Sequence, residues 1–283
     1  MKTGLRIARE QHIPEGGRSG GQSRFRLRAR VIRSVLFAAI YHLISVIYVL
    51  LASLCLILPG RKAVTWVVRR YSRRMVQAMR LVAGIRLKVV GKDKVPANCI
   101  IAAKHHSWFD GFCIYSQFDD VAVVVGDHMD RIPLVGGILE KLGAIVVNNC
   151  GGGKARDALA NNAAQASNDG RRILIYPEGH LSKAGERHRY KSGVWHMYAK
   201  FELPVAPVAT NLGLFAPQKQ FEKNPGTATL EFLDLIPVGL KKAEFMQRLE
   251  AAIETRSDEL IAEARGQPVT RSMLVPDPAS PND

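Results

Sequence analysis

Residues 99–110, CIIAAKHHSWFD, join a short apolar run to a polar segment that carries two histidines and an aspartate. The apolar run has the length and composition of one buried strand. His105 follows it, and Asp110 comes five residues later, so a loop-to-helix turn can bring the carboxylate back to the imidazole. The carboxylate then fixes the ring tautomer, and the other ring nitrogen can take a proton from a hydroxyl group. Alone, this spacing is a weak signal, because many chains contain it.

The same alternation of apolar runs and helical stretches continues along the chain and indicates the fold class. Runs typical of strands lie at residues 99–103, 121–125, 144–147, 173–176, 205–209 and 227–232. Stretches with helical periodicity lie at residues 107–118, 135–141, 155–167, 194–201 and 243–264. Strands that alternate with helices predict an α/β fold with a mixed, largely parallel sheet flanked by helices.

The N-terminal part is strongly basic and contains one apolar run of membrane length. Residues 1–80 hold sixteen Lys and Arg but only two Glu, so they carry nearly all of the formal charge of +15. Residues 35–58 are almost wholly apolar and would form a helix about 36 Å long, against roughly 30 Å of bilayer hydrocarbon. Cations beside such a run favour membrane lipids with anionic headgroups. Nucleic acid is the weaker interpretation, because no base-reading motif is present.

The membrane topology stays open at this point. Both flanks of the apolar run are basic, so charge does not orient a single span. Residues 63–83 place arginines at helical spacing between apolar residues, a pattern typical of a helix in the headgroup plane. A span, a re-entrant hairpin and a buried core helix are the alternatives. We expect a flexible basic arm at 1–33, membrane-embedded or interfacial helices at 34–84, a catalytic domain at 85–265 and a disordered tail at 266–283.

A second polar segment follows the expected strand at 173–176. It begins with Pro177-Glu178-Gly179, and a Glu-Gly turn at a strand end brings backbone N–H groups and a carboxylate to one sheet edge. In α/β folds that edge is where ligands bind. Residues 204–208, PVAPV, add an apolar strand with two prolines, which suits an edge or the wall of an apolar groove.

Taken in order, these segments resemble the glycerolipid (lysophospholipid) acyltransferase family, whose bacterial members make phosphatidic acid from lysophosphatidic acid. His105 and Asp110 match its His-x4-Asp block, and residues 143–149, GAIVVNN, match the second block. Residues 177–179 and 204–208 match the third and fourth blocks. The resemblance covers residues 85–264 and implies an acyltransferase-like fold and reaction.

The resemblance also implies the roles of the catalytic groups. His105 would deprotonate the hydroxyl of a lysolipid, which attacks the thioester of acyl-CoA or of acyl carrier protein, and Asp110 would orient His105. Backbone N–H groups at residues 106–107 or at Gly179 are the candidate oxyanion donors. The thioester is a co-substrate, and no cofactor or metal is implied. The eight-residue spacing of His180, His188 and His196 fits no usual zinc pattern either.

Two departures from the family pattern concern the acceptor. Asn149 and Leu181 stand where the family usually has arginines that are thought to hold the acceptor's phosphate. Either nearby groups replace them, or the acceptor is a lysolipid without that phosphate, such as a lyso-aminolipid. The candidate acceptor- or oxyanion-binding residues are Glu178, Gly179, His180, Asn149, Lys183, Arg187 and Lys191.

Two other functions compete with acyl transfer. A thioester or ester hydrolase would use water in place of the acceptor. A non-catalytic, membrane-attached lipid-binding relative would bind lipid independently of His105. The cysteines, which are Cys55, Cys99, Cys113 and Cys150, form no close pair, so we expect reduced thiols. Reduced thiols fit a catalytic domain that faces the cytoplasm at the inner (cytoplasmic) membrane.

Overall fold

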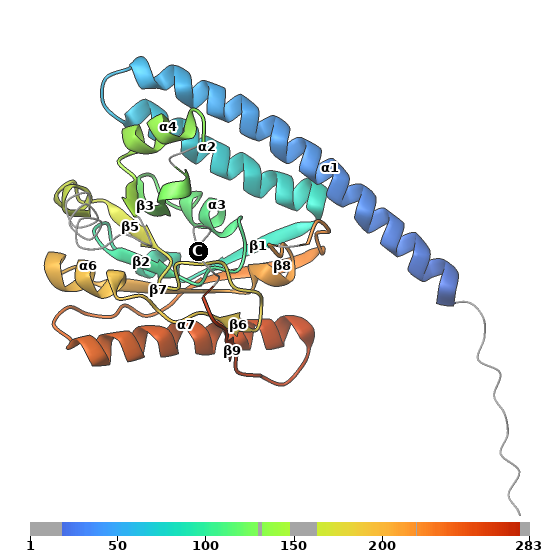
Figure 1. Ribbon diagram of the computed structural model, residues 1–283. Helices are drawn as coiled ribbons and strands as arrows, with labels where there is room; N and C mark the ends of the chain where they lie inside the picture. The colour runs from blue at the N-terminus through green and yellow to red at the C-terminus, as the bar shows by residue number, and fades with distance from the viewer. Residues whose placement is uncertain (1–18, 130–131, 148–162, 219, 278–283) are drawn as a thin grey trace, which may run out of the picture.

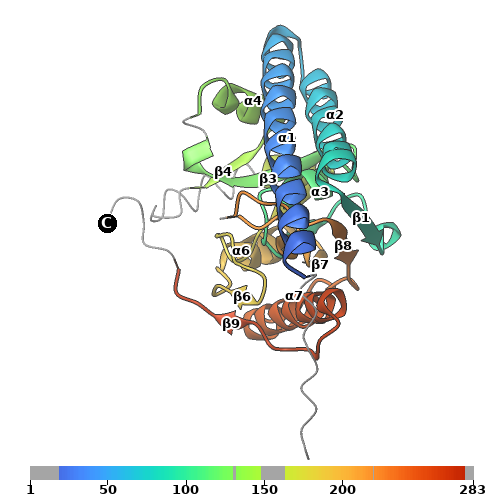
Figure 2. The same cartoon turned by 90° about the vertical axis from the view of Figure 1, so that its right-hand side faces the viewer.

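The computed structural model describes residues 19–129, 132–147, 163–218 and 220–277. In this part of the chain, a seven-stranded sheet lies between two layers of helices (Figures 1 and 2). Across the sheet the order is β1 (Ile85–Val90), β8 (Gly226–Phe232), β7 (Val205–Thr210), β2 (Ile100–Ala103), β5 (Arg172–Ile175), β3 (Val121–Gly126) and β4 (Ile145–Val147). Only the pair of β7 and β8 is antiparallel. The predicted mixed, largely parallel sheet is confirmed.

Helices cover both faces of this sheet (Figure 1). One layer contains α1 (Ser19–Leu54), α2 (Lys62–Ala78), α3 (Asp110–Tyr115) and α4 (Val135–Leu142). The other contains α6 (Gly193–Phe201) and α7 (Lys242–Arg265). The central strand β2 shows why both layers form. Its Ile101 and Ala103 join the core below α2, whereas Ile100 and Ala102 join the core above α6 and α7. A strand that is buried on both faces has to be apolar throughout.

The N-terminal helices form an antiparallel pair on the sheet. α1 is followed by a 3₁₀ turn (Cys55–Ile57), and α2 continues into a π-helical turn (Met79–Ala83). Val64, Val67 and Met75 of α2 are buried, and both helices contact the domain, α2 through α3 and α1 through Phe109. The segment Ala29–Ile57 has a mean hydropathy of 2.4, and only 11% of its apolar window is buried. This helix pair therefore presents a long apolar surface to the outside.

The structure corrects both ends of the expected domain plan. α1 begins at Ser19, so residues 19–33 are helical and do not belong to a flexible arm. Five of the ten residues 24–33 are arginine, a good helix former, and this stretch contains no glycine or proline. At the other end, residues 266–277 are described and contain β9 (Met273–Leu274). β9 pairs with β6 (Glu186–Arg187), a partner that no local pattern reveals.

Three other elements differ from the sequence-based expectation. β1 is an additional strand, and it pairs with β8 at the edge of the sheet. α3 is shorter than residues 107–118, because residues 106–109 form the turn that carries Asp110. Most of the helix expected at 155–167 lies outside the described residues, although residues 163–168 are helical.

Candidate active site

His105 and Asp110 meet where β2 ends and the loop to α3 begins. His105 Nδ1 lies 3.2 Å from Asp110 Oδ2. The aspartate is buried, whereas the His105 side chain keeps 18% of its surface exposed. Because a carboxylate oxygen accepts hydrogen bonds, Nδ1 carries the proton and Nε2 keeps its lone pair. The ring can therefore accept a proton from a hydroxyl group bound beside it.

Tyr176 holds the His105 ring from one side. The two rings stack with centroids 3.8 Å apart and planes 16° apart. β2 and β5 are parallel neighbours, with Ala102 opposite Ile175, so both rings leave the sheet at the same edge. Ser182 donates its backbone N–H to the carbonyl oxygen of His105 at 2.9 Å. These contacts fix the direction of the free ring nitrogen.

The expected oxyanion donors are already engaged within the protein. His106 and Ser107 donate their backbone N–H groups to Asp110 Oδ2 at 2.8 and 2.7 Å. Gly179 donates its N–H to the carbonyl oxygen of Tyr176 at 3.0 Å. The structure thus corrects that expectation. The first two groups hold the Asp110 carboxylate, which in turn faces the His105 imidazole.

Only one of the two adjacent histidines faces outward. His106 is 1% exposed. Burial, and next the charge of Lys104, hold the pKa of the His106 imidazole well below its usual value. A Cβ on Gly213 would lie 2.7 Å from the His106 Cβ, so the loop after β7 packs directly against this residue. His106 is therefore a buried neutral group, and His105 alone can reach a substrate.

Glu178 lies behind the site rather than in it. Its Oε1 is 3.0 Å from Lys104 Nζ, and its Oε2 accepts the His188 backbone N–H at 2.7 Å. Lys104 also donates to both carboxylate oxygens of Glu254, at 2.9 and 3.0 Å. Burial raises the pKa of Glu178, although the charge of Lys104 opposes the shift. The expectation that Glu178 faces the acceptor is corrected: it anchors the turn after β5.

Gly179 lets two of the candidate residues come together. Its backbone is left-handed, with a φ of +72°, and a Cβ there would lie 3.1 Å from Lys191 Cε. Lys191 Nζ lies 3.0 Å from His180 Nε2. Burial, and next the charge of Lys191, lower the pKa of His180. The neutral form of the His180 imidazole is therefore favoured in this pair.

The other candidate residues lie elsewhere. The Lys183 side chain is 66% exposed and pairs with Glu186 at 3.1 Å. Arg187 pairs with Glu250 of α7. Asn149 lies outside the described residues, so its role stays a prediction. Among the residues that the structure describes, no group of three or more His, Cys, Asp or Glu could hold a metal ion.

Four residues of this region were missed by sequence reasoning. Lys104 directly precedes His105, and Tyr176 directly precedes Pro177. Their positions next to two family motifs were the signal that could have identified them. Ser182 lies within the third segment. Asp277 carried no signal, since its partners are more than eighty residues away in the chain.

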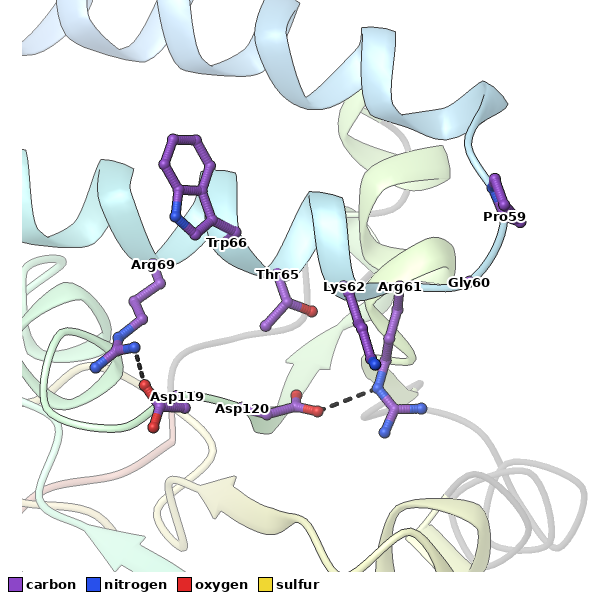
Figure 3. A pocket seen from close by; sticks show the side chains of 9 residues that line it. All are labelled: Pro59, Gly60, Arg61, Lys62, Thr65, Trp66, Arg69, Asp119 and Asp120. Carbon is purple, nitrogen blue, oxygen red and sulfur yellow. Dashed lines mark hydrogen bonds and ion pairs between the residues drawn. The ribbon is translucent and has the colours of Figure 1, made fainter.

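A separate cavity of about 680 Å³ lies below the start of α2 (Figure 3). Figure 3 shows Arg61 reaching Asp120 and Arg69 reaching Asp119 across it, while Trp66 points away from both aspartates. Its lining residues come from the α1–α2 turn, α2 and the segment before β3. This cavity is distinct from the His105 site.

Comparisons with known proteins identify the family of this chain. Residues 86–211 match the family model described as Acyltransferase. The chain is 30% identical over 172 residues to the 1-acyl-sn-glycerol-3-phosphate acyltransferase of Pseudomonas aeruginosa, which covers 60% of this chain and 67% of that protein. It is 31% identical over 131 residues to the protein of the same name from Borreliella burgdorferi, covering 44% of this chain and 51% of that one.

The fold also occurs in a solved structure. It is the crystal structure of the 1-acyl-sn-glycerophosphate acyltransferase from Thermotoga maritima, with a TM-score of 0.67 and 21% sequence identity. The match covers 82% of this chain and 98% of that chain. The layered arrangement of the sheet and its helices is thus common to both proteins.

Proposed function

This chain belongs to the 1-acyl-sn-glycerol-3-phosphate acyltransferase family, and we propose that it acylates 1-acyl-sn-glycerol 3-phosphate to phosphatidic acid. The acyl donor in this proposal is a thioester of CoA or of acyl carrier protein. The single observation that carries the mechanism is the paired His105 and Asp110 beside an outward-facing ring nitrogen.

The reaction follows from the state of the His105 ring. Nε2 takes the proton of the acceptor hydroxyl as its oxygen attacks the thioester carbonyl carbon. Asp110 stabilises the imidazolium that forms. The tetrahedral intermediate then collapses, the carbon–sulfur bond breaks, and the thiolate leaves. The proton on Nε2 passes to that sulfur, so the ring returns to its starting state without a covalent acyl-enzyme.

Lys191 is the proposed partner of the acceptor's headgroup. Lys191 lies on the segment that follows the third block, and its backbone N–H donates to the Pro177 carbonyl oxygen at 2.8 Å. This contact places Lys191, which also pairs with His180, beside the turn that follows Tyr176. Lys191 would supply a charge that Leu181 does not.

A second acceptor class is supported by a different observation. Asp277 lies 3.3 Å from Lys191 Nζ, so the candidate phosphate partner already faces a carboxylate. A lysolipid without a phosphate monoester, such as a lyso-aminolipid, would meet no such competition. The two acceptor classes can be separated by one assay.

The proposed location is the cytoplasmic side of the inner membrane. Residues such as Phe37 and Ala52 of α1 are buried against the protein, while other α1 residues are exposed and apolar. A helix with one face on the domain cannot be surrounded by lipid, so this geometry favours an interfacial helix pair over a free span. Thioester donors are cytoplasmic, which sets the proposed orientation.

The first test is acyl transfer by detergent-purified protein. Lysophosphatidic acid and a lyso-aminolipid are compared as acceptors, and the product lipid is measured. We expect transfer to lysophosphatidic acid, with a His105→Ala variant about 10³-fold slower because the general base is gone. The His196→Ala variant is the matched control, since His196 is exposed on α6 across the sheet, and its rate should equal the parent's.

Other results would point to other functions. Transfer only to the lyso-aminolipid would assign the second acceptor class. Free fatty acid formed at the same rate without any lysolipid would indicate a hydrolase. No His105-dependent transfer to either lipid would overturn the proposal and favour a non-catalytic lipid-binding relative.

A further inference from the structure

A segment near the C-terminus crosses the third block. Residues 271–277, here called the strap, follow α7 and run beside β6 (Figures 1 and 2). Met273 donates its backbone N–H to the Gly185 carbonyl oxygen, and Val275 donates to that of Arg187, both at 2.9 Å. These two bonds fix the direction of the strap across the loop that follows β5.

The start of the strap is anchored in the interior. Ser272 donates its backbone N–H to Asp258 Oδ2 at 2.8 Å and its hydroxyl to Glu254 Oε2 at 3.1 Å. Glu254 is the same carboxylate that binds the buried Lys104. The strap is therefore tied to the interior network that supports the β2 end of the site.

The strap carries one carboxylate into a group of basic side chains. His180, His188 and Lys191, here called the basic cluster, surround Asp277. Asp277 lies 3.3 Å from Lys191 Nζ, 3.6 Å from His188 Nδ1 and 4.0 Å from His180 Nε2. The Asp277 side chain is 43% exposed, so water and ligands can reach this ion pair. An exposed pair of this kind is weak and can be displaced.

The basic cluster adjoins the catalytic loop. His180 is two residues from Ser182, which donates its backbone N–H to the carbonyl oxygen of His105. Lys191 is joined by its backbone to Pro177, the residue after the Tyr176 that stacks on His105. A headgroup bound by the cluster would thus belong to a lipid whose hydroxyl lies near His105.

We propose that Asp277 is a specificity-determining residue for the acceptor, because its carboxylate occupies the basic cluster that a phosphate monoester would need. This inference rests on the proposed function, since it concerns the acceptor of the same reaction. A phosphate dianion has to displace Asp277 before it can pair with Lys191. A headgroup that carries an amine meets no such competition and gains a carboxylate partner.

The test is the Asp277→Asn variant of the full-length protein, which keeps the size of the side chain and removes its charge. We expect its KM for lysophosphatidic acid to fall about threefold to tenfold, while kcat changes less than about twofold. The KM for a lyso-aminolipid should not fall. The Asp234→Asn variant is the matched control, since Asp234 is exposed and pairs with Lys94 away from the basic cluster.

A second variant shows whether the effect passes through the basic cluster. In a Lys191→Gln background the KM for lysophosphatidic acid should be higher, and Asp277→Asn should no longer lower it. A KM that stays at the parent's value, or that rises, in the single Asp277→Asn variant would overturn the proposal. A purely structural role would lower thermal stability without separating the KM values of the two acceptors.

A binding measurement keeps this inference separate from the catalytic proposal. Calorimetry with sn-glycerol 3-phosphate on the His105→Ala protein, with and without Asp277→Asn, requires no turnover. We expect the second change to tighten binding by the same threefold to tenfold factor. Equal affinities, or no binding to either protein, would overturn the role of Asp277. Absence of transfer alongside tightened binding would overturn only the proposed reaction.

Discussion

The His105 imidazole is held by contacts that constrain it in different ways. Asp110 fixes the proton on Nδ1, whereas the stacked Tyr176 ring fixes the plane. The Tyr176 hydroxyl finds no hydrogen-bond partner within the described part of the chain, and burial raises its pKa well above the usual value. The hydroxyl is therefore neutral, and Tyr176 contacts His105 only through the face of its ring.

This division of roles predicts opposite outcomes for two Tyr176 variants. Tyr176→Phe keeps the ring, so kcat should stay within about twofold of the parent's value. Tyr176→Ala removes the stack and lets the imidazole turn, which should lower kcat by about tenfold to a hundredfold. Acyl transfer kinetics on both purified variants check this. A large loss in Tyr176→Phe would show that the hydroxyl takes part in the reaction.

At the scale of elements, one buried lysine and its two carboxylate partners connect segments that are far apart in the chain. Lys104 follows β2 and contacts Glu178 of the turn after β5 and Glu254 of α7. Tyr190 donates its hydroxyl to Glu254 at 2.9 Å, and Ser272 of the strap donates to the same carboxylate. Both carboxylates pair with the same ammonium group. The charge of Lys104 therefore offsets the free-energy cost of burying them.

Removal of that charge should therefore cost much stability. Lys104→Met leaves two buried carboxylates without their cation and should lower the free energy of unfolding by about 3–5 kcal/mol. Urea unfolding in detergent, followed by tryptophan fluorescence, measures the change. Lys94→Met is the matched control, because Lys94 forms an exposed pair with Asp234 and should matter little. Similar midpoints for both variants would contradict this account of the network.

At the scale of the whole molecule, the helix pair joins an exposed apolar surface to the loop that carries His105 and Asp110. Phe109 of that loop packs against Phe37 and Tyr41 of α1, with ring centroids 5.5 and 5.8 Å apart. α1 exposes apolar side chains that include Leu43, Val46, Ile47, Leu50, Leu51 and Leu54. α2 exposes Lys62, Trp66, Arg70, Arg73 and Arg74, and the π-helical turn after it exposes Arg80. Both surfaces suit a bilayer interface with anionic lipids.

The two surfaces should contribute differently to membrane binding. Replacement of Arg70, Arg73 and Arg74 by glutamine should weaken binding to anionic vesicles by roughly tenfold or more at low salt, since each cation contributes about 1 kcal/mol there. Neutral vesicles should be bound as before. Sedimentation with phosphatidylcholine vesicles, with and without phosphatidylglycerol, measures this.

The apolar surface supplies the matched comparison. Replacement of Leu43, Val46 and Leu50 by glutamine should weaken binding to both kinds of vesicle, and added salt should not restore it. If the arginine variant bound neutral vesicles as weakly as anionic ones, the arginines would contribute to binding by something other than attraction to anionic lipids.

Much of the fold was predictable because its signals are local. The apolar runs at β2, β5 and β7 are buried on both faces of the sheet, whereas β8 alternates buried with more accessible residues, and both patterns predict strands. The pairing of His105 with Asp110 was predictable for a similar reason, because a strand end and a tight turn join them within a few residues. The long apolar N-terminal helix was likewise predictable from composition, whereas its attachment to a membrane stays a prediction.

What only the tertiary structure decided depends on contacts between distant residues. Glu178 looked like an acceptor ligand, yet Lys104 and the backbone of His188 draw it into the interior. Asp277 looked like part of a disordered tail, yet strand pairing with β6 brings its segment onto the basic cluster. A sequence records which groups a chain carries. Which of them face solvent and which satisfy one another is settled by packing between segments far apart in the chain, and no local pattern encodes that.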